Sequence, residues 1–156
     1  MRVSLVTVSS RPPAWAQTAF DDYAQRLKPR LPLTVRELAL GNRKGGADPQ
    51  RAVADEGKRI LAALSAQDHV VALDERGTER STREFAAWLG RRLQEAQDLV
   101  FLIGGPDGFD ALTLARANER WSLSKLTLPH ALAKVLFVEQ LYRAVTVLDG
   151  HPYHRD

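Results

Sequence analysis

The sequence of 156 residues contains no cysteine, which excludes disulfide bonds, cysteine nucleophiles and zinc–thiolate sites. It also lacks a long uninterrupted apolar run, so no segment predicts a transmembrane helix. Met1 and Arg2 lead directly into a strand-like stretch at 3–8 without a separate cleavage region, so we do not expect a signal peptide. These absences make a cytoplasmic protein without membrane contact the expectation.

Neither sign of charge dominates the whole chain, whose formal net charge is +3. The charges are unevenly distributed, however. Residues 1–59 carry 11 Lys and Arg against 6 Asp and Glu, whereas residues 60–156 carry 11 against 13. A basic N-terminal part is typical of contact with nucleic-acid phosphates, although a solvated basic surface gives the same count. The length predicts one domain over residues 1–156.

Strand-like and helical patterns alternate along the chain. Apolar, β-favouring stretches predict four strands, and apolar residues at helical spacing, together with capping residues, predict the segments between them. The expected strands are 3–8, 33–40, 69–73 and 99–103, and the expected helices are 14–27, 49–65, one capped by Ser81, 109–119 and 130–148. Residues 74–77 read as a turn, and 126–128 as a short strand or extended loop. This order predicts an α/β fold with a mostly parallel sheet and helices on both faces.

The stretch 98–108 is the most distinctive part of the sequence. A buried-strand pattern ends at Gly104 and Gly105, and Pro106 can occupy the first turn of a following helix. Open α/β sheets bind ligands at the carboxyl ends of such strands, although two glycines also suit an ordinary tight turn. The order G-G-x-x-G differs from a dinucleotide fingerprint, which disfavours a Rossmann oxidoreductase. Asp107, unless it caps the helix, favours a cofactor with little phosphate charge.

The loop at 41–47 is rich in glycine and carries the adjacent cations Arg43 and Lys44. Such a loop can grip a phosphodiester backbone or simply connect two elements. The helix after it is expected to begin with Asp48 as the cap and Pro49 at its first position.

The expected last helix, 130–148, is apolar nearly all round, so it must be buried in the core or covered by a second subunit. Glu139 and Arg143 lie four residues apart on it and can form an ion pair with either a structural or a functional role. The tail that follows contains aromatic, histidine and arginine side chains, which are unusual in a disordered terminus. Its two histidines lack further clustered ligands, so we expect no metal site.

Four ordered motifs carry a family resemblance: FLIGGPDG at 101–108, WSLSKLTLPH at 121–130, EQLYRA at 139–144 and HPYHR at 151–155. Together they resemble the pseudouridine N3-methyltransferases of large-subunit ribosomal RNA, of the SPOUT class, and the similarity runs from Met1 to Asp156. The resemblance implies a SPOUT-like fold with a C-terminal trefoil knot, a homodimer, and S-adenosyl-L-methionine as the methyl donor. It also implies a pseudouridine target in 23S ribosomal RNA, presented by the assembled ribosome.

The same resemblance implies the cofactor-binding residues. They lie at the ends of expected strands and in the loop before the last helix: Leu73, Gly104, Gly105, Gly108, Leu123, Ser124, Lys125, Leu126, Thr127 and Leu128.

The catalytic candidates are Arg143 and the tail residues Tyr153, His154 and Arg155. The N3 imide of a pseudouridine must lose its proton, and histidine is the usual group for such a transfer near neutral pH. We therefore expect His154 to take the proton, Arg155 to stabilise the imide anion or bind phosphate, and Tyr153 to stack on a base. Positioning of RNA without chemistry is the alternative for these residues. A non-catalytic RNA-binding protein of the same fold is the alternative for the whole chain.

Overall fold

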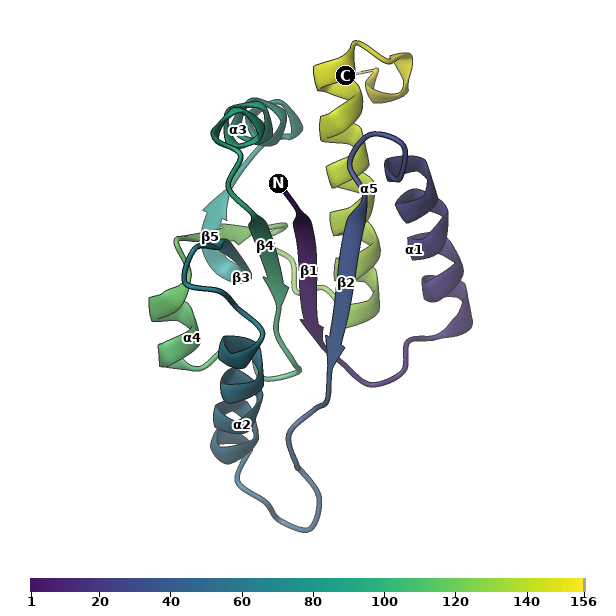
Figure 1. Cartoon of the computed structure of the whole chain (residues 1–156). Coiled ribbons are helices and arrows are strands. Elements are labelled where there is room, and N and C mark those ends of the chain that lie inside the picture. Colours follow the sequence, from purple (N-terminus) through teal and green to yellow (C-terminus); the bar gives the residue numbers. More distant parts are fainter. Residues whose placement is uncertain (156) are drawn as a thin grey trace.

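The computed structural model describes residues 1–155 and is built on a central sheet of five strands (Figure 1). The strand order is β2-β1-β4-β3-β5, and every neighbouring pair is parallel. The strands are β1 (Val3–Val8), β2 (Leu33–Leu38), β3 (His69–Glu79), β4 (Leu99–Ile103) and β5 (Glu119–Ser122). The prediction of a mostly parallel α/β sheet is confirmed.

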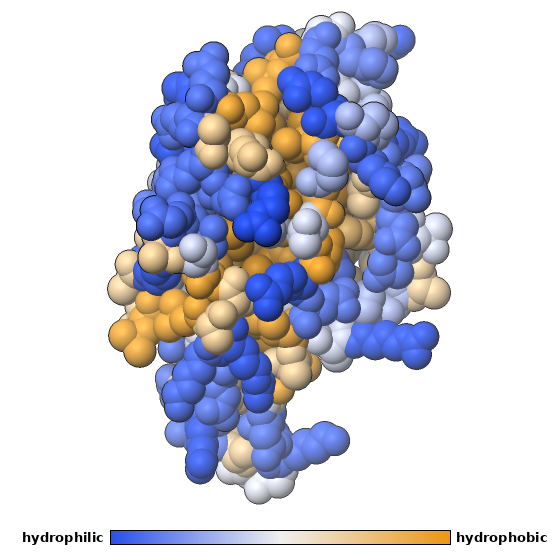
Figure 2. All heavy atoms as spheres, viewed as in Figure 1, coloured by the Kyte–Doolittle hydropathy of each residue, from blue (hydrophilic) through white to orange (hydrophobic). Residues whose placement is uncertain are grey.

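Helices cover both faces of this sheet, as predicted. Three helices pack against the face of the sheet that includes Leu5 and Phe101, and together they form one apolar core. These helices are α1 (Ala14–Leu27), α3 (Thr82–Glu95) and α5 (His130–Asp149). The opposite face, which includes Val6 and Leu102, packs against α2 (Pro49–Ala62) and the segments beside the short α4 (Ala111–Arg116). Apolar side chains gather around α4 in Figure 2, where Leu112 is 70% exposed.

The edge of the sheet at β3 and β5 differs from the prediction. Residues 74–77 are not a simple turn, because β3 continues to Glu79 and pairs again with β5 after an irregularity between Leu73 and Thr78. Gly77 permits this second pairing, since a Cβ there would lie 2.6 Å from the carbonyl carbon of Arg120. The fifth strand lies at 119–122, and residues 126–128 belong to the loop that follows it.

The segment after the glycine turn also differs from the prediction. Pro106 lies in a tight turn closed by the Gly108 N–H, which donates to the Gly105 carbonyl at 3.0 Å, and not in a helix. The helix begins later, at Ala111, where the Asp110 side chain accepts from the Thr113 N–H at 3.0 Å. Asp107 is therefore not a helix cap.

The long α5 lies between α1 and α3 on one face of the sheet, so the chain itself buries most of its apolar surface. Its buried side chains include Phe137, Val138 and Leu141, whereas Leu132 is 44% exposed. Burial of the helix, one of the two expected arrangements, is thus confirmed. The trefoil knot stays a prediction. Within residues 1–155, no helix has both the length and the apolar character needed to cross a membrane.

Candidate active site

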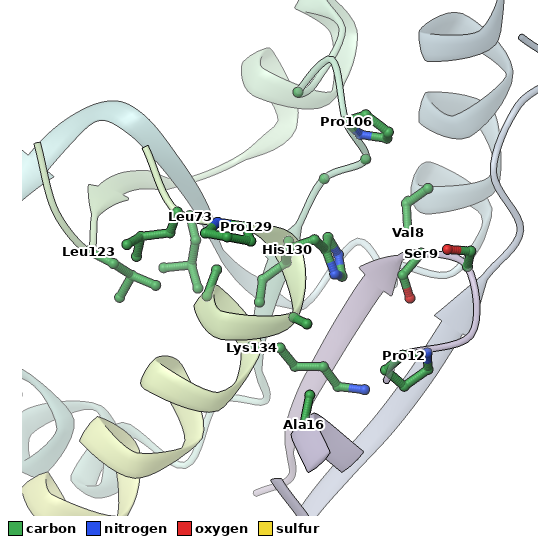
Figure 3. Close-up of a pocket in the computed structure, with 18 of the residues that line it drawn as sticks. Val8, Ser9, Pro12, Ala16, Leu73, Pro106, Leu123, Pro129, His130 and Lys134 are labelled. Atoms are coloured by element: carbon green, nitrogen blue, oxygen red, sulfur yellow. The ribbon is translucent and has the colours of Figure 1, made fainter. Parts of the chain in front are cut away.

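A pocket of about 530 Å³ opens at the carboxyl ends of the strands (Figure 3). Val8 of β1, Leu73 of β3 and Ile103 of β4 lie side by side there because the three strands are adjacent and parallel. The amino-terminal turn of α5 and the loop before it complete the walls. This is the edge at which open α/β sheets bind ligands.

The cofactor residues expected from the sequence come together in this pocket, with one difference. Its lining includes Leu73, Gly104, Gly105, Gly108, Leu123, Ser124, Leu126, Thr127 and Leu128. Lys125 does not line it, because its side chain is 87% exposed and its ammonium lies 3.6 Å from Glu79. The loop 123–128 therefore lines the pocket at every position except Lys125, which extends into solvent.

The glycine turn packs tightly against its surroundings. A Cβ at Gly105 would lie 2.9 Å from Oε1 of Glu56, and one at Gly104 would lie 3.2 Å from the backbone of Gly108. Gly108 has φ +78°, a conformation that side chains rarely adopt. The turn thus needs its glycines both to lie close to α2 and to keep its backbone shape beside the pocket.

Arg43 connects the basic loop to this turn. Its guanidinium donates to both carboxylate oxygens of Glu56, at 2.6 and 3.1 Å, and to Asp107 at 2.9 Å. Glu56 is 2% exposed and also accepts from the Gly41 N–H at 2.8 Å. Hydrogen bonds to Glu56 and Asp107 raise the pKa of Arg43, which stays charged.

These contacts revise the hypothesis for the loop 41–47. Arg43 is occupied within the protein and supports the glycine turn, while the neighbouring Lys44 is exposed. Asp107, expected to disfavour phosphate, is paired with this arginine.

The other end of the pocket was not predicted. It is lined by Ser9 and Pro12 after β1, Ala16 of α1, and His130 and Lys134 of α5, as Figure 3 shows. His130 Nε2 shares a hydrogen bond of 2.9 Å with the hydroxyl of Thr7. Burial and then the charge of Lys134 lower the pKa of His130, against a smaller opposing effect of Glu37. The imidazole is therefore neutral at neutral pH. One sequence signal could have indicated part of this end. In a parallel sheet, the carboxyl end of the expected strand 3–8 lies at the same edge of the sheet as residues 104–108.

The catalytic candidates lie elsewhere. Tyr153 and His154 belong to a 3₁₀ turn, η1 (Pro152–His154), beyond the carboxyl end of α5. The Tyr153 hydroxyl donates to Glu139 at 3.2 Å, and its ring lies 4.8 Å from the Arg143 guanidinium carbon. Arg143 also donates to the His154 carbonyl at 3.0 Å.

The structure therefore brings the tail and Arg143 together, and none of the four candidates lines the pocket of the same chain. Arg143 also forms the expected ion pair with Glu139, at 2.7 Å. Arg155 is exposed, and Nδ1 of His154 is buried without a hydrogen-bond partner among residues 1–155.

The pocket fits S-adenosyl-L-methionine in size and chemistry. Apolar side chains such as Leu73, Leu123 and Ile103 can hold an adenine ring, and the glycine turn leaves its backbone open to close approach. In the part of the chain that the structure describes, no cluster of three or more His, Asp or Glu is arranged to hold a metal ion.

Fold and pocket together define an α/β protein that binds a small ligand at the carboxyl edge of a parallel sheet. A family model described as a predicted SPOUT methyltransferase matches residues 1–154. The chain belongs to the SPOUT methyltransferase family, and it is a methyltransferase.

Curated relatives match it over nearly their whole length. The protein named ribosomal RNA large subunit methyltransferase H from Methylococcus capsulatus is 48% identical over 155 residues, which cover 99% of this chain and 100% of that protein. Proteins of the same name from Alkalilimnicola ehrlichii and Hahella chejuensis are 50% and 44% identical, and the matches cover 99% and 100% of both this chain and the respective relative.

Proposed function

We propose that this protein transfers the methyl group of S-adenosyl-L-methionine to N3 of a pseudouridine in large-subunit ribosomal RNA, on the assembled ribosome. The observation that carries the proposal is the pocket, which gathers nine of the expected cofactor residues, Gly104 and Gly105 among them, at one edge of the sheet. The names of the full-length relatives support ribosomal RNA as the substrate.

When bound, the cofactor supplies an electrophilic methyl group on a sulfonium, so the protein has to bind, orient and manage a proton. Leu73, the glycine turn and the loop 123–128 hold the cofactor in this proposal. The protein must also align N3 with the methyl carbon and remove the imide proton, for which His154 is our candidate.

The tail reaches a pocket only in a homodimer. A helix of 20 residues is about 30 Å long, and α5 has the pocket at its first turn and the tail after its last. A second copy that runs in the opposite direction would bring its own tail to this pocket. Exposed apolar side chains near the rim support such contact: Trp15 is 58% exposed and Leu132 is 44% exposed.

The test uses ribosomes from cells that lack the methyltransferase. The protein is incubated with 70S ribosomes, free large subunits or naked 23S RNA and methyl-labelled cofactor, and the nucleosides are examined by mass spectrometry. We expect labelled N3-methylpseudouridine with 70S ribosomes and little with naked RNA. Binding to ribosomes without cofactor binding or methyl transfer would instead indicate a non-catalytic RNA-binding protein. Label on another nucleoside would refute the assignment of N3.

A further inference from the structure

Lys134 is a buried cation in the pocket wall. Its residue is 4% exposed, although lysine usually keeps its ammonium group in water. It lies one helical turn after His130, and both side chains contribute to the pocket lining. A buried charge is costly unless partners compensate for it, so the partners of this ammonium are informative.

The protein compensates the charge of Lys134 only in part. The ammonium donates to Glu37 at 2.9 Å and lies 4.6 Å from the centre of the Phe20 ring. Glu37 itself is 47% exposed, so water shares that carboxylate. An ammonium has three donors, and Glu37 is the one hydrogen-bond acceptor that residues 1–155 give it.

The ammonium lies at the end of the pocket that the expected cofactor residues do not line. Figure 3 shows the Lys134 side chain extending toward Pro12 and Ser9, away from Leu73 and Leu123. His130 lies between the two ends and adds a polar ring that is neutral at neutral pH. Lys134 is the buried cation at this end, where Arg11 also lines the pocket but is exposed.

We propose that Lys134 Nζ binds an anionic oxygen at this end of the pocket. The inference rests on the proposed function, which provides two sources of such an oxygen. One is the carboxylate of the methionine part of the cofactor. The other is a carbonyl oxygen next to N3 of the target base, which gains negative charge as the imide proton leaves. In both cases the buried ammonium supplies a charge-assisted hydrogen bond.

The experiment compares the wild type with Lys134→Met and Lys134→Arg. The matched control is Lys58→Met, which removes an exposed lysine of α2 that does not line the pocket. Calorimetry measures affinity for S-adenosyl-L-methionine and for its decarboxylated analogue, which keeps the sulfonium and the amine. Methylation of 70S ribosomes at saturating cofactor gives kcat from pH 6 to 9.

A carboxylate role predicts that Lys134→Met weakens S-adenosyl-L-methionine binding about tenfold or more and leaves the analogue within about twofold, because a charged hydrogen bond is lost. A role at the base predicts unchanged affinities and a kcat at least about tenfold lower, with recovery at alkaline pH, where the imide ionises without help. In either case Lys134→Arg should retain most of the wild-type value, since it keeps the cation.

Two results would overturn the inference. Lys134→Met could match Lys58→Met in both affinities and in kcat, or it could weaken the binding of both ligands equally, as the loss of a purely structural residue would. If Lys134→Met does not fold, Lys134→Gln is used in its place. If the wild type binds S-adenosyl-L-methionine and the decarboxylated analogue with equal affinity, the cofactor carboxylate is not the anionic oxygen. A wild type that neither binds the cofactor nor methylates ribosomes contradicts the proposed function instead.

Discussion

Gly105 is the residue at which the backbone of the turn comes closest to a buried charge. Its missing side chain leaves room for Glu56, which Arg43 and the Gly41 N–H hold in place, so the carboxylate has little freedom to withdraw. We expect Gly105→Val to lower the free energy of unfolding by about 1–3 kcal/mol, as overpacking does. We also expect it to weaken cofactor binding, because the turn must shift toward the pocket.

Urea unfolding and calorimetry measure the two effects. Gly90→Ala is the control, because it adds a methyl group inside α3, away from the pocket lining. Cofactor affinity equal to that of the wild type in Gly105→Val would show that the turn has no part in binding.

His130 reports on the charge of Lys134 from one helical turn away. Burial is the largest cause of its lowered pKa, and the lysine charge is the next. In Lys134→Met we expect the pKa of His130 to rise and to remain below the ordinary 6.5, because burial persists. Titration of the imidazole signals by NMR measures both values. An unchanged pKa would mean that the ammonium and the imidazole are not in the arrangement described.

The first and fourth strands of the sheet follow directly from the sequence, whereas the fifth does not. Residues 99–103 are all buried and strongly apolar, so their pattern is unambiguous. By contrast, β5 is four residues long and begins with Glu119 and Arg120. This strand is stabilised by pairing with the extension of β3 and by polar contacts of Glu119. Because these partners lie far away in the sequence, the local residue pattern does not predict the strand.

The pocket, like the sheet, could be predicted from the sequence only in part. The glycine turn could be found from its local residue pattern, whereas the loop 123–128 was assigned to the cofactor only through the family resemblance. The contributions of Ser9, His130 and Lys134 depend on the strand order, which places β1 beside β4. Periodicity cannot supply that order.

Glu119 of β5 connects β3, β5 and α3 through hydrogen bonds. It accepts hydrogen bonds from His69 at 2.6 Å, Trp88 at 2.9 Å and Trp121 at 3.2 Å. Burial alone would raise the pKa of this carboxyl, but hydrogen bonds from the same three side chains outweigh burial and lower it.

A carboxyl whose pKa is lower in the folded state adds stability above its unfolded pKa, near 4.5, and loses it as the pH falls through the folded value. We therefore expect the free energy of unfolding to fall with pH below about 4.5, and Glu119→Gln to show a shallower fall. Urea unfolding at a series of pH values measures the slope, with Glu84→Gln, a substitution at an exposed capping-box carboxyl, as the control. Equal slopes in Glu119→Gln and the wild type would contradict this role.

The length of α5 sets the organisation of the whole molecule. Pocket and tail lie at opposite ends of a helix about 30 Å long, so one chain alone cannot bring them together. The tail is nevertheless held in a defined conformation by Glu139, Arg143 and Tyr142. We therefore propose that the tail acts on the pocket of a second copy, because a two-fold dimer would repeat this contact at both pockets.

Mixed dimers test this arrangement. One variant lacks residues 151–156 and keeps its pocket; the other carries Gly105→Val and keeps its tail. Each homodimer should have little activity at a cofactor concentration that saturates the wild-type pocket but not the Gly105→Val pocket. In a mixed dimer, the intact pocket of the first subunit meets the intact tail of the second, so one of the two sites is complete. Random mixing makes about half of the dimers mixed, so we expect about a quarter of the wild-type activity.

Sedimentation and differently tagged subunits establish that mixing has occurred. If confirmed mixed dimers are inactive, each tail does not serve the partner's pocket. If the tail-deleted homodimer is fully active, Tyr153, His154 and Arg155 have no role in methyl transfer.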